Sequence, residues 1–337
     1  MYKFKEKVAN NKAITLISLV ITIVVLLILA GVTISMISGN ESIIDNAKKA
    51  NDTNKLQAES EEIQAIINMA SAKGIKNGNY SGSITVEEAK TAITNKFSDA
   101  QFLNNEFPLG VVIGGNRYSI DNLGEVGYFI DKEYLKSTGT QYIDTEVNPA
   151  NTVDFEITFK TDVNAMTVDA SNLNNAFFGT SNIEINRTLS LNFGARKDEC
   201  VIYTWKNNTY TNGAAVKCFE TTWMNPINKL KISCVNNVWK VNGNQYGAAT
   251  SVGDWKDTDS NLIVFGLSRI RDGAKTIVPF YENMYLYSLK IWDNGELIRD
   301  FTPVISYKNG HENEPCLFDK VGNKFYYNQG SGTFETN

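Results

Sequence analysis

The sequence predicts a long N-terminal helix that carries a small α+β head and is followed by a large all-β sandwich. Three observations lead to this fold class. Residues 14–37 are almost entirely apolar, residues 43–70 place apolar side chains at helical spacing, and short strand patterns separated by turns fill the chain from residue 134 onward. Apolar residues at every third or fourth position are typical of a helix face, and many short strands are typical of a sandwich.

The apolar segment predicts a membrane-spanning helix. Residues 13–40 carry no charge, and the part from 14 to 37 makes a helix of about 36 Å, enough to cross a hydrocarbon core of about 30 Å. Positive charge precedes it, so we expect a single-pass membrane protein with a cytoplasmic N-terminus whose later residues lie outside the cell. The lysines that supply this charge are Lys3, Lys5, Lys7 and Lys12.

Other kinds of N-terminal segment fit less well. A cleaved secretory signal has an apolar region of about 7–15 residues and an A-x-A site, whereas this run is longer and no A-x-A follows it. A lipoprotein signal needs a cysteine where Val32 stands. A plain membrane anchor remains an open alternative.

A second helical pattern follows the apolar segment. Apolar side chains recur at steps of three and four between residues 43 and 70, with charged residues between them, which predicts an amphipathic helix. Gly74 and the Asn-Gly-Asn of residues 77–79 are stop signals, so we expect one continuous helix over residues 14–79. A membrane anchor joined to a stalk helix would satisfy the same pattern.

Residues 12–21 read Lys-Ala-Ile-Thr-Leu-Ile-Ser-Leu-Val-Ile. This run resembles the N-terminal cleavage and methylation motif of type IV prepilins, in its Gram-positive variant. The resemblance implies that a prepilin peptidase cuts between Ala13 and Ile14, which removes a leader of residues 1–13 and leaves Ile14 as a methylated N-terminus. Two residues depart from the family: Ala13 replaces its glycine, and Ser18 replaces the glutamate that pairs with a neighbouring subunit's terminal amine.

Residues 80–130 predict the small α+β head, which is pilin-like in this resemblance. Thr85-Val86-Glu87-Glu88 forms a capping box at the start of a helical pattern that runs to residue 97. Two strand patterns, 111–113 and 117–120, are joined by a Gly-Gly-Asn turn and predict a hairpin.

Residues 131–337 form the predicted all-β domain. All five tryptophans and all four cysteines lie after residue 199, which marks a change of composition. Residues 133–145 and 288–303 resemble the opening and the close of a concanavalin A-like, or laminin-G-like, jelly-roll module, and residues 315–334 continue the resemblance. It implies a jelly-roll sandwich of a kind common on surface proteins.

Aromatic and arginine side chains in turn-rich segments of this domain are candidate ligand-binding residues. Flat rings stack on the apolar face of sugars, and polar side chains bind hydroxyls or carboxylates. Trp239 and Trp292 lie inside strand patterns, so we expect both in the core. The candidates for carbohydrate binding are Arg196, Trp205, Tyr210, Trp255, Arg269 and Arg271.

We expect no cofactor except Ca²⁺, whose preference for oxygen ligands fits the loop acids Asp254, Asp257 and Asp259. Of the cysteines, Cys200 and Cys218 could close a hairpin as a disulfide, and Cys316 is predicted to be a buried thiol. No CxxC pair occurs, which argues against a structural zinc site.

The sequence does not predict an enzyme or a nucleic-acid-binding protein. His311 is the only histidine and belongs to no catalytic motif, so we expect it in a surface loop. Asp154 and Glu156 share one face of a strand pattern, and we expect both on the solvent side. The net charge is −5 and no basic stripe appears after the N-terminal lysines, which disfavours nucleic acid.

These patterns together predict a minor or tip subunit, pilin-like and displayed on the cell surface or a pilus, whose jelly roll binds glycans or glycoproteins. The expected partners are a prepilin peptidase, other pilin subunits, the membrane and the bound glycans or glycoproteins. Two alternatives stay open. The jelly roll could be purely architectural, or it could be a displayed glycan-active enzyme that uses Asp154 and Glu156.

Overall fold

A computed structural model describes residues 18–30, 43–76, 84–150, 152–161, 176–182, 184, 187–196, 199–206, 229–236, 238–248, 260–280 and 283–337. The chain divides into two compact units, Met1–Glu59 and Ser60–Asn337. The first unit contains helical residues 18–30 and the start of helix α2 (Ile43–Lys76). The second unit contains the end of α2, helix α3 (Val86–Lys96) and all the described strands.

The predicted single long helix over residues 14–79 is wrong, and so is the membrane span at 14–37. The structure describes helix over 18–30 and over Ile43–Lys76 as separate elements. Helix α2 is long but rich in charged residues. Among the described residues no helix is both long and apolar enough to cross a membrane, so the predicted single-pass membrane localisation is corrected.

The local signals between residues 84 and 131 are confirmed. At the start of α3, the Glu88 N–H donates to Thr85 Oγ1 at 3.3 Å and the Thr85 N–H donates to Glu88 Oε2 at 2.9 Å, which completes the capping box. Four strands then form an antiparallel meander that includes the predicted hairpin. They are β1 (Gln101–Phe102), β2 (Leu109–Ile113), β3 (Asn116–Ile120) and β4 (Val126–Asp131).

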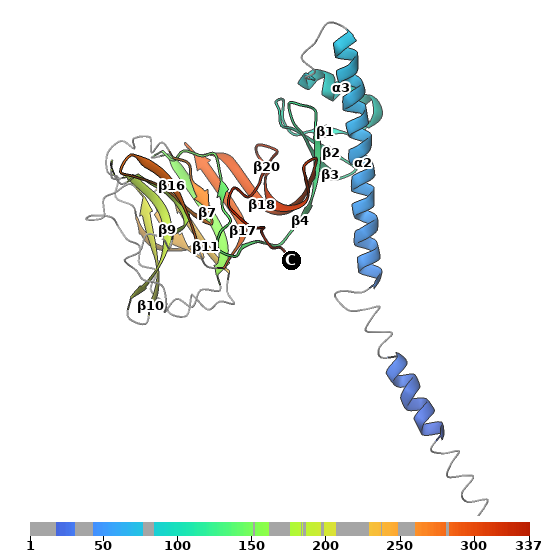
Figure 1. Ribbon diagram of the computed structural model, residues 1–337, viewed down its shortest axis with the longest axis horizontal. Coiled ribbons are helices and arrows are strands. Elements are labelled where there is room, and N and C mark those ends of the chain that lie inside the picture. The colour runs from blue at the N-terminus through green and yellow to red at the C-terminus, as the bar shows by residue number, and fades with distance from the viewer. Residues whose placement is uncertain are drawn as a thin grey trace, which may run out of the picture. The chain divides into compact units, whose positions relative to one another are not determined.

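Two large sheets make up the rest of the second unit, which is therefore rich in β-sandwich structure (Figure 1). The 13-stranded sheet adds to the meander the strands β5 (Leu135–Ser137), β7 (Val153–Thr161), β11 (Leu230–Val235), β12 (Val238–Val241), β13 (Asn244–Ala248), β17 (Met284–Asp293), β18 (Glu296–Lys308), β19 (His311–Asp319) and β20 (Lys324–Tyr326). The seven-stranded sheet contains β6 (Ile143–Asp144), β8 (Ala176–Asn182), β9 (Arg187–Arg196), β10 (Glu199–Lys206), β14 (Ile263–Val264), β15 (Gly266–Arg271) and β16 (Ala274–Pro279).

The core between the sheets is apolar and aromatic. Phe155 packs against Phe178 with ring centroids 4.9 Å apart and against Trp239 at 5.7 Å. Trp239 is buried as predicted. Trp292 is only partly buried, contrary to the prediction, because Ile291 points into the core and successive residues of a strand point to opposite faces.

The long strand β18 connects the meander to the sandwich. Its first half pairs with β17, and residues Val304 to Tyr307 pair with β4, antiparallel in both cases. The 13-stranded sheet therefore runs without interruption across residues 130 and 131 (Figure 1). The boundary between a head at 80–130 and a jelly roll at 131–337 stays a prediction, and hydrogen bonds cross it.

Candidate functional site

Helical residues 18–30 form the most apolar surface of the described chain. Their large side chains are exposed on every face, from Val24 at 47% to Leu27 at 67%. The only polar side chains among them are hydroxyls, and Thr22 turns its hydroxyl back to the Ser18 carbonyl oxygen at 2.8 Å. A helix that is apolar all round is typically buried in a larger body. None of the described residues of its own unit covers this helix.

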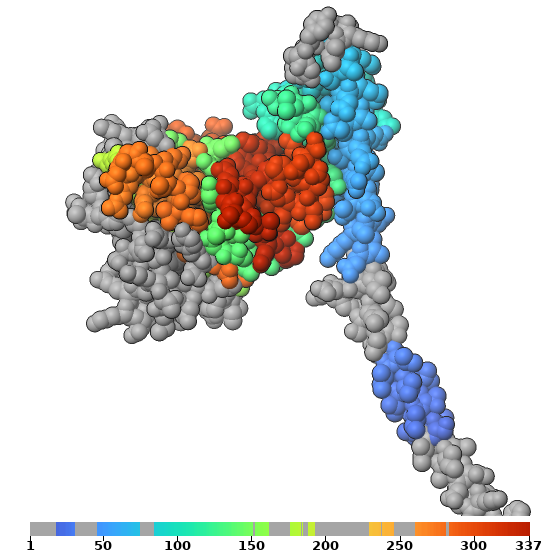
Figure 2. Space-filling view, viewed as in Figure 1, coloured from blue at the N-terminus to red at the C-terminus, as the bar shows by residue number. Residues whose placement is uncertain are grey.

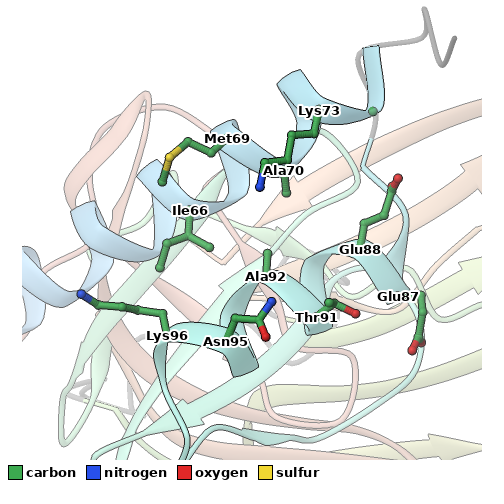
Figure 3. A pocket seen from close by; sticks show the side chains of 11 residues that line it. Ile66, Met69, Ala70, Lys73, Glu87, Glu88, Thr91, Ala92, Asn95 and Lys96 are labelled. Carbon is green, nitrogen blue, oxygen red and sulfur yellow. The ribbon is translucent and has the colours of Figure 1, made fainter. Parts of the chain in front are cut away.

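A second apolar surface is a groove between the C-terminal part of α2 and α3, with a volume of about 540 Å³. Figure 3 shows Ile66 and Ala70 of α2 on the side that faces Ala92 of α3. Met69 lines the groove and remains 59% exposed. Lys96 closes one end through an ion pair of 2.5 Å with Glu62.

A third hollow, of about 530 Å³, lies where the meander meets the C-terminal strands, and we call it the junction cleft. Its walls come from the loop before β2, from β3 and the turn that follows it, and from β18 and β20. On the face drawn in Figure 2 the red surface of the C-terminal strands borders the teal and green surface of earlier residues. Strand β4 pairs with both β3 and β18, which brings these segments of the cleft together.

Two lysines line the junction cleft, and acidic side chains neutralise both. Lys308 Nζ lies 2.6 Å from Asp121 Oδ2 and 3.8 Å from Glu125 Oε2. Lys324 Nζ lies 2.7 and 2.6 Å from the two carboxylate oxygens of Glu146. The cleft thus combines fixed ammonium groups with fixed carboxylates.

Aromatic rings form the apolar wall of the junction cleft. Phe107, Phe325 and Tyr327 line it, and the Tyr327 ring stacks on the ring of His311 with centroids 3.6 Å apart and planes 8° apart. The Tyr327 hydroxyl lies 2.9 Å from Ser306 Oγ. Burial raises the pKa of the Tyr327 phenol far above its ordinary value, so the hydroxyl keeps its proton and the wall stays uncharged.

Small residues on neighbouring strands let the C-terminal strand lie close to the sheet beside this cleft. Gly110, Ser119 and Gly127 face one another in register on β2, β3 and β4. A Cβ at Gly127 would lie 2.9 Å from Phe325, and the Ser119 hydroxyl donates to the Asn323 carbonyl oxygen at 2.5 Å. The small residues at these positions leave room for the Phe325 ring to lie against the sheet.

Only part of the predicted ligand-binding set can be placed. Arg269 is partly buried on β15 in register with Ser181, and Arg271 is exposed, with Nε 3.6 Å from Asp272 Oδ2. Arg196 pairs with Glu199 at one end of the β9–β10 hairpin, whereas Trp205 pairs with Ser190 six residues further along β10, about 20 Å away at 3.3 Å per residue. The hairpin therefore separates these two. Tyr210 and Trp255 lie outside the described residues.

The sequence reasoning missed a polar row on the seven-stranded sheet. Ser181 Oγ and Thr188 Oγ1 are 2.8 Å apart, and Asn192 Nδ2 donates to Ser190 Oγ at 2.8 Å. All four side chains are buried. Within the described part of the chain, Asn192 Oδ1 and Arg269 Nε are buried polar atoms without a hydrogen-bond partner. The sequence signal was a Thr-x-Ser-x-Asn alternation in β9.

The two carboxylates considered as catalytic acids, Asp154 and Glu156, each contact another group of the protein. Asp154 is only 8% exposed, so its predicted place on the solvent side is wrong: its Oδ2 accepts the Asn236 N–H at 3.0 Å. Glu156 Oε1 lies 2.8 Å from Lys231 Nζ on the next strand. His311 begins strand β19 and stacks on Tyr327, which corrects the predicted surface loop.

The structure describes some of the predicted cysteine and metal-site residues and not others. Cys234 and Cys316 are both buried, as predicted for Cys316, and burial raises the pKa of the Cys316 thiol well above its ordinary value. The described residues contain no cluster of three or more metal-ligating side chains. Outside the described residues lie Ala13, Ile14, Cys218, Asp254, Asp257, Asp259 and the side chain of Cys200.

A comparison with known protein families, with curated proteins and with solved structures finds no match for this chain. The structure itself defines the class: a protein rich in β-sandwich structure, with an uncovered apolar helix near its N-terminus. Any function must therefore be argued from its own residues.

Proposed function

We propose that this protein is a pilin-like filament subunit that presents a jelly-roll module for binding glycans or glycoproteins. The observation that carries the proposal is the helix of residues 18–30, which is apolar and exposed on every face. At about 25 cal/mol per Å² of apolar surface buried, covering such a helix favours assembly strongly. In a filament, the same helices of neighbouring subunits supply the cover for one another.

The prepilin-like run at residues 12–21 supports this role, since the described part of the exposed helix begins at Ser18, four residues after the expected new N-terminus Ile14. The partners in this proposal are a prepilin peptidase and further pilin subunits. Removal of residues 1–13 also removes four lysines, whose charge would oppose close packing of helix ends.

The jelly-roll part of the proposal is supported by how the two resembling segments meet. Strand β5, from the predicted opening of the module, pairs antiparallel with β17, which leads into its predicted close, with Met284 opposite Ser137. Glu335 near the C-terminus also pairs with Lys136. A module of about 200 residues on every subunit would crowd a fibre, which favours a minor or tip position.

Filament assembly is tested by charging the apolar helix. The full chain is produced with a prepilin peptidase and compared with Leu27→Glu by ultracentrifugation and electron microscopy. We expect the unsubstituted chain to associate through this helix and to sediment, and the variant to remain in the soluble fraction. Leu123→Glu is the matched control, because Leu123 is a 72% exposed leucine of the other unit, and it should assemble normally. Equal assembly of Leu27→Glu and the unsubstituted chain would refute the proposal.

Processing is tested by N-terminal sequencing of the assembled protein, which should begin at Ile14. A chain that assembles with Met1 in place would remove the prepilin part of the proposal. Ligand binding is measured on a glycan array with calcium and with chelator, which also tests the predicted Ca²⁺.

A further inference from the structure

We infer that the junction cleft is a binding site for a neutral sugar residue. The inference rests on the proposed function, since it names the ligand class and the place of binding on the protein. Its volume of about 530 Å³ lies within the range of about 300–1,000 Å³ typical of small-ligand sites.

The charges around the cleft select against an anion. Lys308 and Lys324 contribute two positive charges, and three carboxylates lie within 4 Å of their ammonium groups, those of Asp121, Glu125 and Glu146. The local sum is −1. A carboxylate on the ligand would have to compete with these ion pairs, whereas a hydroxyl adds hydrogen bonds without adding charge.

The polar groups of the cleft match the hydroxyls of a sugar. An ammonium group has three donors. Lys324 Nζ contacts both carboxylate oxygens of Glu146 and lies 5.0 Å from the centre of the Tyr326 ring. The Asn122 side chain lines the cleft and is exposed, and its amide both donates and accepts. Hydroxyls that donate to a carboxylate and accept from an ammonium or amide group fit this combination.

The rings supply the apolar half of the site. Phe325 and Tyr327 lie with ring centroids 6.1 Å apart and planes 17° apart, so their faces point in nearly the same direction. Tyr327 is held by its stack on His311 and by its contact with Ser306. A sugar presents a C–H face to Tyr327 and to the edge of Phe325, which is only 7% exposed, and its hydroxyl edge to Lys308, Lys324 and Asn122. Rings that are already held in place lose little entropy on binding.

The test uses the purified full chain and isothermal titration calorimetry. The probes are methyl glycosides of glucose, galactose and mannose, each paired with its uronate. We expect at least one neutral glycoside to bind and its uronate to bind at least tenfold more weakly. Asn122→Ala and Lys324→Met should each weaken the neutral sugar by tenfold or more. Lys320→Met is the matched control, because this exposed lysine does not line the cleft, and should leave the Kd unchanged.

Thermal unfolding of each variant checks the fold, and Asn122→Ala keeps the test decisive if Lys324→Met is unstable, because Asn122 is exposed. Binding that survives both cleft variants but falls with Arg269→Ala would overturn the cleft and leave glycan binding on the seven-stranded sheet. A uronate that binds more tightly than its neutral partner overturns the charge argument. No heat with any neutral glycoside overturns the inference, while filament assembly, measured separately, decides the proposed function.

Discussion

Asp319 is a buried carboxylate that organises the turn between β19 and β20, and its removal has a calculable cost. Its side chain is fully buried and accepts the backbone N–H groups of Asp300, Val321 and Gly322 at 2.9, 3.0 and 3.0 Å. Arg299 Nε lies 3.7 Å away. Asp319→Ala deletes the acceptor of all three bonds and leaves the arginine charge without this partner.

Hydrogen bonds to a charged group contribute about 1.5–3 kcal/mol each. The Asp300 N–H lies within the sheet, so we count its bond in full. Those of Val321 and Gly322 lie in a partly exposed turn, where water replaces part of the loss. We therefore expect Asp319→Ala to lower the free energy of unfolding by about 3–5 kcal/mol, a large share of the total of about 5–15 kcal/mol.

The assay is urea unfolding of the full chain followed by tryptophan fluorescence, which reports the β part because every tryptophan lies after residue 199. Asp300→Ala is the matched control. Its carboxylate makes only a partly exposed contact of 3.7 Å with Lys290, so we expect a loss below about 1 kcal/mol. A loss of less than about 1 kcal/mol for Asp319→Ala, or equal losses for the two variants, would refute the reasoning.

Three further outcomes follow from the structure. Thr85→Ala should destabilise α3 by about 1 kcal/mol, because the hydroxyl that accepts the Glu88 N–H is lost. Separately, hydrogen bonds from Thr85 lower the pKa of Glu88, so the contribution of the Glu88 carboxylate is complete above the ordinary pKa of a glutamate and is lost as the pH falls through the lowered one. Denaturation at several pH values measures this dependence. Trp239→Ala empties a fully buried site and should cost about 3–5 kcal/mol in the same urea assay. Cys316 and Cys234 should react with a thiol reagent only at the rate of unfolding, since both are buried and burial raises the pKa of Cys316; rapid labelling of native protein would contradict this.

Local sequence signals predicted local structure well. The capping box at residues 85–88 and the hairpin around Gly114 and Gly115 depend on residues within four positions of one another, so their physics is complete in the sequence. Phe155, Ile157 and Phe159 alternate along β7 and all lie in the core. Asp154, on the same strand, was wrongly predicted to face solvent. The residue that contacts it, Asn236, comes from a different hairpin.

The long helix was predicted by joining two patterns, and that step was the error. Apolar composition at 14–37 and amphipathic spacing at 43–70 each favour helix, and each is satisfied by its own segment. Neither pattern contains a physical requirement that the two segments be one helix. The described helices, residues 18–30 and Ile43–Lys76, each agree with one pattern.

The junction cleft was not predicted at all. Two segments about 200 positions apart line it, and no periodicity connects them. One supplies the lysines and rings at residues 308–327, and the other supplies the loop residues at 107–122. The only sequence signal was the aromatic run Phe325-Tyr326-Tyr327, which was assigned to the close of the jelly roll.

The sequence by itself determined where this protein is apolar and where its helix α3 begins, because side-chain hydropathy and backbone capping act over a few residues. Tertiary structure alone decided that β4 pairs with β18, which acids neutralise Lys308 and Lys324, and that His311 lies on Tyr327. Strand pairing is a choice among many partners of similar local propensity, and it is made by the burial of the whole sheet, so the site that depends on it emerges only when the chain has folded.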